Sequence, residues 1–300
     1  MIVHPGRGWS VCPGAAGRFP DCMIVPDCMI TGMAGRHGNV RWSSSGGTLR
    51  VVAWGTVSRT DSRTVRPVDL TGVLRRTLLV GPDGRRDTSS EVVWLQGPSL
   101  YVDVRRPAGT PRDPDDDRAW ARAHEGFAGR CTRTADGVTH WERAVDVRAP
   151  GPFPDAGLLT RDGADVVERG VHVPYTERWA PEPVPPGAPV AGALLRAVDD
   201  GRAGVLVRAG DRFGWACGRG PDDDPADPLT AHVAVGRITG AGWIVELATL
   251  PRLEGRDLRP HRDAAGLGTD ARTWQVLDTE VVGGHDPLNL LTNSTPLTKE

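Results

Sequence analysis

The sequence predicts an all-β protein, and two of its features carry that prediction. Short runs of apolar or alternating residues recur along most of the chain, and alternation with a period of two is the pattern of a half-buried strand. Turn signals such as Asp136-Gly137, Asp162-Gly163 and Asp200-Gly201 separate the runs, and glycine closes such hairpins because it adopts positive φ at low cost. The runs are Val92–Gln96, Ser99–Arg106, Phe127–Thr134, Val138–Arg148, Gly157–Arg161, Val171–Trp179, Ala191–Val198, Gly204–Arg208, Arg212–Gly218, Ala231–Thr239, Ala241–Thr249 and Thr273–Val281.

Consecutive strands joined by tight turns form an antiparallel meander, and a long meander curls until its two edges pair. We therefore expect a lipocalin-like antiparallel β-barrel of about eight to ten strands with one short helix. The segment PDDDRAWARAHEGF predicts the helix, because aspartates precede and enter its first turn and Trp120 and His124 follow one turn apart. This helix could cover one mouth of the barrel.

The first 65 residues differ in composition from the rest of the chain. They are rich in Gly, Pro, Arg and Ser, they show no sustained period, and they repeat PDCMI at Pro20–Ile24 and Pro26–Ile30. We expect residues 1–65 to be a poorly ordered leader or upstream sequence included in the gene, with Thr48–Thr60 as the one plausible strand. The barrel domain is expected over residues 66–300.

Charge and hydropathy exclude several classes of function. The 36 Lys+Arg against 38 Asp+Glu give a net charge of -2, which provides no basic excess for nucleic acid. The sequence contains neither the long apolar run of a membrane helix nor the pattern of a signal peptide, so we expect a cytoplasmic protein with no membrane partner. Lys299 is the only lysine, which is typical of a GC-rich bacterial genome.

The cysteines and the short motifs indicate no cofactor. Five cysteines without a CxxC spacing indicate neither a zinc site nor a disulfide framework, and Cys131 and Cys217 are expected as buried apolar residues. The sequence has no GxSxG, no HExxH, no phosphate loop and no dinucleotide fingerprint. The acidic stretch Pro221–Pro228 is expected to be a solvated turn. We therefore expect no metal and no cofactor.

The stretch Leu100–Arg106 interleaves two kinds of side chain. Period-2 geometry places Tyr101, Asp103 and Arg105 on one face and three aliphatic residues on the other. The charges either point to water or line a cavity. The second placement is favoured because the helix or the N-terminal segment could cover the aliphatic face, and because an Asp and an Arg on one face can pair, as burial requires.

The order of several motifs resembles the lipocalin-like proteins related to a fungal kinase-interacting family. The likeness covers roughly residues 91–180, and it implies a calycin-type barrel and a protein partner while transferring no catalytic residue. The second half of the chain is then expected to supply further barrel strands. The matching positions are Tyr101, Asp103 and Arg105; Phe127, Ala128 and Gly129; Trp141 and Asp146; Asp155 and Gly157; and Tyr175, Glu177 and Trp179.

We expect one ligand site in the barrel lumen, lined by polar and aromatic side chains from strands distant in sequence. Asp103, Glu177 and Tyr175 are the candidates for proton transfer there, and Arg143 or Arg105 would hold an anionic or carbonyl group. The residues expected to line the site are Gln96, Tyr101, Asp103, Arg105, Trp141, Arg143, Tyr175, Glu177, Trp179, Trp215 and His232.

Three functions remain open at this point. The first is a binding protein for a small, partly polar organic molecule, and the second is a metal-free isomerase, cyclase or lyase of secondary metabolism acting in the same lumen. The third is a protein–protein interaction module that binds a partner or a second copy of the chain. A buried carboxyl in an enclosed pocket would favour the enzyme, an enclosed apolar pocket the binding protein, and a filled lumen with an exposed apolar patch the interaction module.

Overall fold

A computed structural model describes residues 40–45, 48–53, 65–110, 116–149, 151–264, 266–269 and 272–293. The chain divides into two compact units, residues 1–60 and residues 61–300. The first unit contains an antiparallel hairpin of β1 (Val40–Ser45) and β2 (Thr48–Ala53). The strand expected over Thr48–Thr60 is thus present over its first part. The PDCMI repeats, and with them the prediction of a poorly ordered leader, lie outside the described residues.

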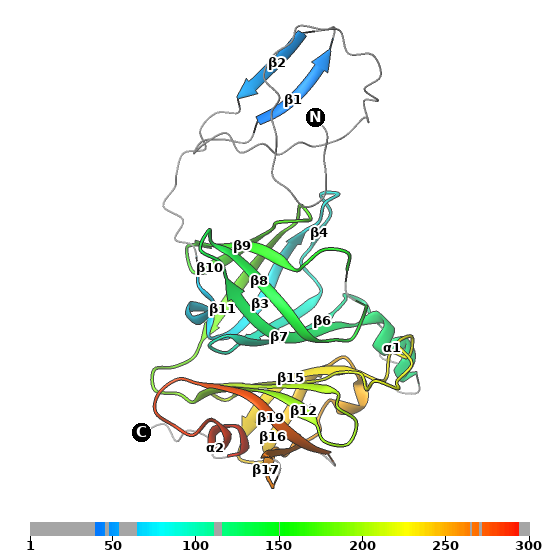
Figure 1. Cartoon of the computed structure of the whole chain (residues 1–300), viewed down its shortest axis with the longest axis vertical. Helices are drawn as coiled ribbons and strands as arrows, with labels where there is room; N and C mark the ends of the chain where they lie inside the picture. Colours follow the sequence, from blue (N-terminus) through cyan, green and yellow to red (C-terminus); the bar gives the residue numbers. More distant parts are fainter. Residues whose placement is uncertain are drawn as a thin grey trace, which may run out of the picture. The chain divides into compact units, whose positions relative to one another are not determined.

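The second unit begins with a closed antiparallel barrel (Figure 1). A sheet of nine strands runs in sequence order except for its shortest strand, and its last strand pairs back with its first long strand. The two-residue β4 (Arg86–Asp87) pairs only with that long strand, so eight strands close the barrel. These are β3 (Gly72–Val80), β5 (Glu91–Gln96), β6 (Leu100–Arg106), β7 (Glu125–Arg133), β8 (Val138–Asp146), β9 (Ala156–Asp162), β10 (Asp165–Gly170) and β11 (Thr176–Pro183). The predicted all-β barrel is confirmed.

The later strands do not enter the barrel. They form a separate eight-stranded antiparallel sheet with the order β16-β15-β14-β13-β12-β19-β18-β17. Its strands are β12 (Val190–Ala197), β13 (Ala203–Ala209), β14 (Arg212–Cys217), β15 (His232–Thr239), β16 (Gly242–Ala248), β17 (His261–Asp263), β18 (Gly266–Thr269) and β19 (Arg272–Val281). The expectation that the second half supplies further barrel strands was therefore wrong, because β11 returns to β3 and leaves no open edge.

Glycine turns shape the hairpins of both sheets. Gly137, Gly163 and Gly201 have φ values of 92°, 63° and 74°, which only glycine adopts without strain. They join β7 to β8, β9 to β10 and β12 to β13, as the Asp-Gly steps of the sequence predict.

The two sheets share a hydrophobic core between them. Leu100, Val102 and Val104 on the outer face of β6 are at most 1% exposed and pack in one cluster with residues of β13 and β15, such as Val205 and Val233. Figure 1 shows the strands of the second sheet lying beside β6 and β7. The aliphatic face of β6 is thus covered by the second sheet rather than by the helix that the sequence suggested. The N-terminal segment, the other cover that the sequence suggested, lies mostly outside the described residues.

The predicted helix is present as α1 (Asp117–Ala123), where the carboxylate of Asp116 caps the N-terminus by accepting from the Ala119 backbone N–H at 2.8 Å. The helix contacts the 3-10 turn η2 (Pro251–Leu253) that follows β16.

A second helix, α2 (Pro287–Thr292), was not predicted, and its Leu291 is buried in the core of the second sheet. A further 3-10 turn, η1 (Pro67–Leu70), precedes β3. Among the described residues, no helix has the length and hydropathy needed to cross a membrane.

Candidate functional site at the barrel mouth

The charged face of β6 points into the barrel. Tyr101 is 0% exposed and Asp103 is 3% exposed, and Tyr101 belongs to the interior cluster of the barrel. On β11, Glu177 and Trp179 are buried in the same way. The inward placement inferred from the alternating pattern of both strands is what the structure shows.

Tryptophan rings fill most of the lumen. The centroid of the Trp94 ring lies 5.4 Å from that of Trp179 and 5.7 Å from that of Trp141, both in edge-to-face geometry. Gln96 is buried beside them, where its Oε1 accepts from Trp94 Nε1 at 2.9 Å and its Nε2 donates to backbone carbonyls. The cavity that remains measures about 10 Å³, which is room for no more than one water molecule. An organic ligand therefore does not fit in the lumen as the structure shows it.

A network of ion pairs surrounds the barrel mouth. Arg105 donates to Asp103 at 2.8 Å and lies 3.6 Å from Glu177, and Arg76 donates to both Glu177 and Asp87 at 2.8 Å. Burial raises the pKa of Asp103, and the neighbouring Arg105 opposes that shift. The paired carboxylates and guanidinium groups satisfy the requirement that charges taken out of water have partners.

Arg143 lies in the same mouth region. Its guanidinium donates to Asp146 at 2.7 Å and to Asp155 at 2.5 Å. It also lies over the ring of Phe127, 3.7 Å from the centroid, and Arg105 lies 4.8 Å from the same centroid. We call this set the mouth network, and its members are Arg76, Arg105, Arg143, Asp87, Asp103, Asp146, Asp155 and Glu177.

Glu168 is the titratable group of the lumen that the sequence analysis missed. It is 4% exposed, accepts from the Tyr175 hydroxyl at 2.6 Å and from Trp179 Nε1 at 3.1 Å, and has no ion pair among the described residues. Glu177 is its cross-strand partner on β11. Desolvation, followed by the nearby Glu177 carboxylate, raises the pKa of Glu168 to about 8.

The pattern that would have revealed Glu168 lies in the segment Asp165–Gly170. Val166 and Glu168 alternate with Val167 there, so Glu168 shares the inward face of Val166, which is 0% exposed. The segment is a strand of only six residues, and it was absent from the predicted runs. Arg76, Asp87 and Asp155 were missed as site residues for a different reason, since only the closed barrel brings them to the mouth.

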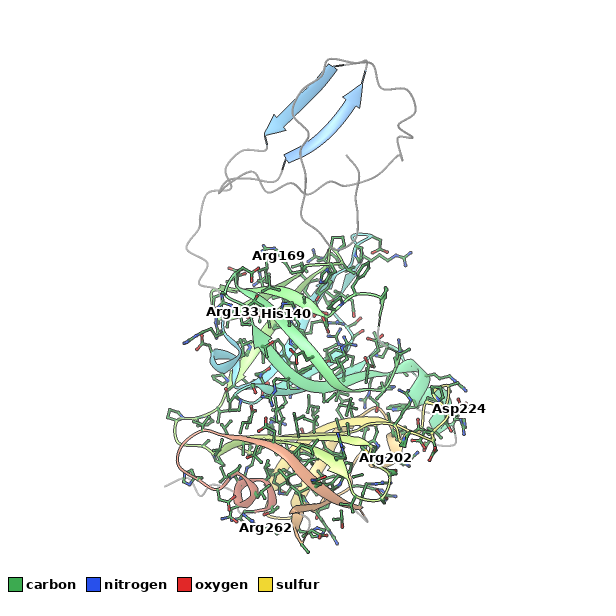
Figure 2. All side chains as sticks on the ribbon, in the orientation of Figure 1. Arg133, His140, Arg169, Arg202, Asp224 and Arg262 are labelled. Atoms are coloured by element: carbon green, nitrogen blue, oxygen red, sulfur yellow. The ribbon has the colours of Figure 1, made fainter. Side chains whose placement is uncertain are left out.

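An open cleft of about 490 Å³ lies at this mouth, and we call it the mouth cleft. Phe153 and Val173 on its rim are 57% and 38% exposed, and the His172 ring stacks on Phe153 with a centroid distance of 5.8 Å. The cleft and the small lumen cavity share Trp141 and Asp155, and Tyr175 connects the cleft to Glu168. The lining residues are His140, Trp141, Glu142, Arg143, Gly151, Pro152, Phe153, Pro154, Asp155, Ala156, His172, Val173 and Tyr175, and Figure 2 labels His140 on the barrel.

The predicted site residues divide between the two sheets. Nine of them belong to the barrel, and all of these except Gln96 line the mouth cleft or the lumen cavity or are members of the mouth network. The nine are Gln96, Tyr101, Asp103, Arg105, Trp141, Arg143, Tyr175, Glu177 and Trp179. Trp215 and His232 do not join them. They lie on β14 and β15 of the second sheet, where Trp215 Nε1 is 3.3 Å from His232 Nε2 and the Trp215 ring packs against Trp274. Their inclusion in the lumen was wrong, because strand parity does not say which sheet a strand joins.

No metal-binding group emerges from the part of the chain that the structure describes. No cluster of three or more His, Cys, Asp or Glu side chains there has the arrangement of a metal site. Cys131 and Cys217 are free and buried, as the sequence predicts for them.

The fold and the mouth region define an all-β protein with a closed eight-stranded barrel and an attached open sheet. A similar structure is that of an uncharacterized protein, YLR301w, from Saccharomyces cerevisiae, with a TM-score of 0.50 and 11% sequence identity. The match covers 70% of this chain and 99% of the yeast chain, so it supports the fold alone. No protein-family model matches the sequence, and a search of curated proteins finds no match.

Proposed function

We propose that this chain is a small-molecule-binding barrel protein that holds its ligand in the mouth cleft. The observation that carries this proposal is the contrast between two spaces, about 10 Å³ in the lumen and about 490 Å³ in the cleft. Ligand pockets of proteins usually measure roughly 300–1,000 Å³ and combine apolar walls with a few placed polar groups. The mouth cleft has the size and composition of such a site.

The chemistry of the cleft walls supports a partly polar organic ligand. Trp141, Phe153 and Tyr175 offer aromatic surface, and Phe153 and Val173 are exposed enough to lose water contact when a ligand covers them. Asp155 and the imidazoles of His140 and His172 offer hydrogen-bonding groups on the same walls. The ligand is expected to bury an apolar group against Phe153 and to direct a polar group toward Asp155.

The buried carboxyl of Glu168 is the observation that favours an enzyme, yet its position argues against one. The lumen cavity beside it is too small for a substrate, and the Tyr175 hydroxyl occupies the contact between Glu168 and the cleft. A general acid or base must come within hydrogen-bonding reach of the proton that it moves. We therefore place binding ahead of catalysis.

A protein–protein module is the second candidate, because the lumen is filled and the mouth carries exposed apolar side chains. Phe153, Val171 and Val173 are 57%, 44% and 38% exposed on the loops beside the cleft. The resemblance to a lipocalin-like, fungal kinase-interacting family supports this candidate by analogy only. A partner that buries all three residues would compete with a small ligand for the same surface.

The proposal is tested by screening fragments of neutral, cationic and anionic charge against the whole chain by ligand-observed NMR. Hits are expected to lose binding in the double variant Phe153→Ser/Val173→Ser. They should keep it in the control Val198→Ser/Leu277→Ser, which removes two apolar residues of at least comparable exposure in and directly beside strands of the second sheet. If no fragment of any charge depends on Phe153 and Val173, the small-molecule function is wrong. Burial of the same patch by a protein would then stand in its place.

A further inference from the structure

We propose that the mouth cleft selects a small organic cation, such as a quaternary ammonium or an amine, and that its binding releases the proton held by Glu168. This inference rests on the proposed function and names its ligand class. It is carried by three features of the barrel mouth, which are the balance of charge, the aromatic walls, and the contact that Tyr175 makes between the cleft and the lumen.

The charge balance of the mouth network favours a cation. Three guanidinium groups meet five carboxylates, so the network keeps an excess of two negative charges. Each arginine is already engaged with two carboxylates, including Arg143, which bridges Asp146 and Asp155. An anionic ligand would have to compete with these carboxylates for Arg143 and would meet Asp155 and Glu142 on the cleft wall. A cation shares Asp155 with Arg143 but breaks none of these ion pairs, and the excess negative charge of the network attracts it.

The aromatic walls supply the second half of a cation site. Trp141, Phe153 and Tyr175 line the same cleft as Asp155. The faces of such rings attract ammonium groups through their quadrupoles, with Trp the strongest, and a nearby carboxylate adds Coulomb attraction. Aromatic rings are a recurring protein environment of quaternary ammonium ligands.

The link to Glu168 follows from its neighbours. Its carboxyl faces Glu177 on β11, Asp155 before β9, the Tyr175 hydroxyl, Arg105 on β6 and Cys131 on β7. Desolvation raises the pKa of Glu168 most, and Glu177 and Asp155 raise it further, so the carboxyl holds its proton at neutral pH. A cation bound against Asp155 offsets that repulsion and stabilises the carboxylate. The O–H bond of Glu168 then breaks, its electron pair stays on the carboxylate oxygen, and the proton leaves to solvent.

One unpartnered polar group lies beside the same cavity as Glu168. The Tyr101 hydroxyl is fully buried, lines the small cavity together with Glu168 and Asp155, and has no hydrogen-bond partner within the described residues. A buried hydroxyl without a hydrogen-bond partner is unfavourable in the folded state. A water molecule held between Tyr101 and the newly formed Glu168 carboxylate would satisfy both groups.

The first experiment uses the unaltered chain and three soluble probes of nearly equal shape. Choline, its neutral isostere 3,3-dimethylbutan-1-ol and the anion 3,3-dimethylbutanoate are titrated calorimetrically at pH 7.5. Choline is expected to bind about tenfold more tightly than the neutral alcohol, and the anion more weakly than either. Equal affinities for choline and the alcohol would refute charge selection while leaving small-molecule binding intact, and binding of none of the fragments would remove both proposals.

The second experiment counts protons. Choline binding is measured in buffers of different ionisation enthalpy between pH 7 and pH 9, where the wild type should release a fraction of one proton and gain roughly three- to tenfold in affinity as the pH rises. Glu168→Gln is expected to bind choline with neither proton release nor pH dependence. Glu182→Gln, on the exposed end of the same sheet, serves as the control and should behave as the wild type. The double variant His140→Gln/His172→Gln measures what the imidazoles add. Proton release that persists in Glu168→Gln overturns the assignment to Glu168.

Discussion

The barrel and the second sheet both have tryptophan in their interiors, but they differ in the polar groups that are buried beside it. Trp94, Trp141 and Trp179 fill the barrel, and Trp215, Trp243 and Trp274 belong to the core of the second sheet. Edge-to-face pairs occur in both, as Trp94–Trp179 at 5.4 Å and Trp215–Trp274 at 5.1 Å. Tryptophan content alone therefore does not tell a packed core from a candidate site.

The buried polar groups make the difference between the two regions. Inside the barrel, Asp103, Glu168 and Glu177 are all less than 5% exposed. In the second sheet, the buried Arg208 donates to the backbone carbonyls of Gly210, Leu290 and Asn293, so it ties α2 and the residue after it to β13. Carboxylates around the barrel mouth create a negative electrostatic potential that can attract a ligand. An arginine that is enclosed by backbone carbonyls stabilises the fold instead.

The largest effect is expected from removing the guanidinium of Arg76 in the barrel. Glu177 is 2% exposed and accepts from Arg76 at 2.8 Å, so Arg76→Ala leaves a buried carboxylate with only Arg105 at 3.6 Å. The free energy of unfolding in urea should fall by about 3–5 kcal/mol. This loss would show that the barrel interior depends on its ion pairs.

Two further variants serve as controls for the loss of stability in Arg76→Ala. Arg75 is the residue before Arg76 in β3, and its side chain is 39% exposed while it pairs with Glu182, so Arg75→Ala should cost less than about 1 kcal/mol. The double variant Arg76→Ala/Glu177→Gln should recover part of the loss, since the unpaired charge is gone. An Arg76→Ala protein as stable as Arg75→Ala would mean that water reaches Glu177 and that the Arg76–Glu177 pair behaves as an exposed surface ion pair.

The fold class was predictable because strand alternation and Asp-Gly turns are local signals. The hairpins at Gly137 and Gly163 and the N-cap at Asp116 all lie where the sequence places them. The separation into a barrel and a second sheet was not predictable, since it depends on β11 pairing with β3 about a hundred residues earlier. Neither β3 nor β11 carries a residue pattern from which its pairing with the other strand could be predicted.

The site was predictable only where alternation assigns a face. Tyr101, Asp103 and Glu177 were correctly placed inside because polar residues alternate with aliphatic ones on their strands or flank a tryptophan. Glu168 was missed because its strand was not recognised. Trp215 and His232 share the same alternation and still lie elsewhere, because a period of two distinguishes the faces of a sheet but not one sheet from another.

The pH dependence of stability should separate the barrel from the second sheet, and Glu168 gives the larger effect. The folded chain holds the Glu168 proton up to a pKa of about 8, whereas an unfolded glutamate releases its proton near pH 4.3. Between these values the folded state binds more protons, so this contribution to stability is complete at low pH and is lost as the pH rises. Relative to Glu168→Gln, the wild type should lose on the order of 3 kcal/mol between pH 5 and pH 9.

Glutamine is the matched replacement for the protonated carboxyl. Its amide oxygen can accept from Trp179 Nε1, and its NH₂ group can donate to the Tyr175 oxygen. Urea unfolding at several pH values gives both curves. Parallel curves for the wild type and Glu168→Gln would show that Glu168 is ionised in the folded chain at neutral pH, and the proton release proposed above would lose its source.

His232 in the second sheet should give a smaller effect of the opposite sign. Desolvation, followed by Arg252, Arg202 and Arg272, lowers the pKa of His232 to about 4, whereas an unfolded histidine titrates near 6.5. The folded state then binds fewer protons between these values, so stability falls as the pH falls through this window. Because the side chain is partly exposed, solvent reduces the effect to about 1–2 kcal/mol between pH 7 and pH 4.5, measured against His232→Gln, whose amide can still accept from Trp215 Nε1. A wild type that keeps pace with the variant on acidification would mean that His232 is charged in the folded chain. Both regions would then hold a titratable proton at Glu168 and His232, and this difference between them would disappear.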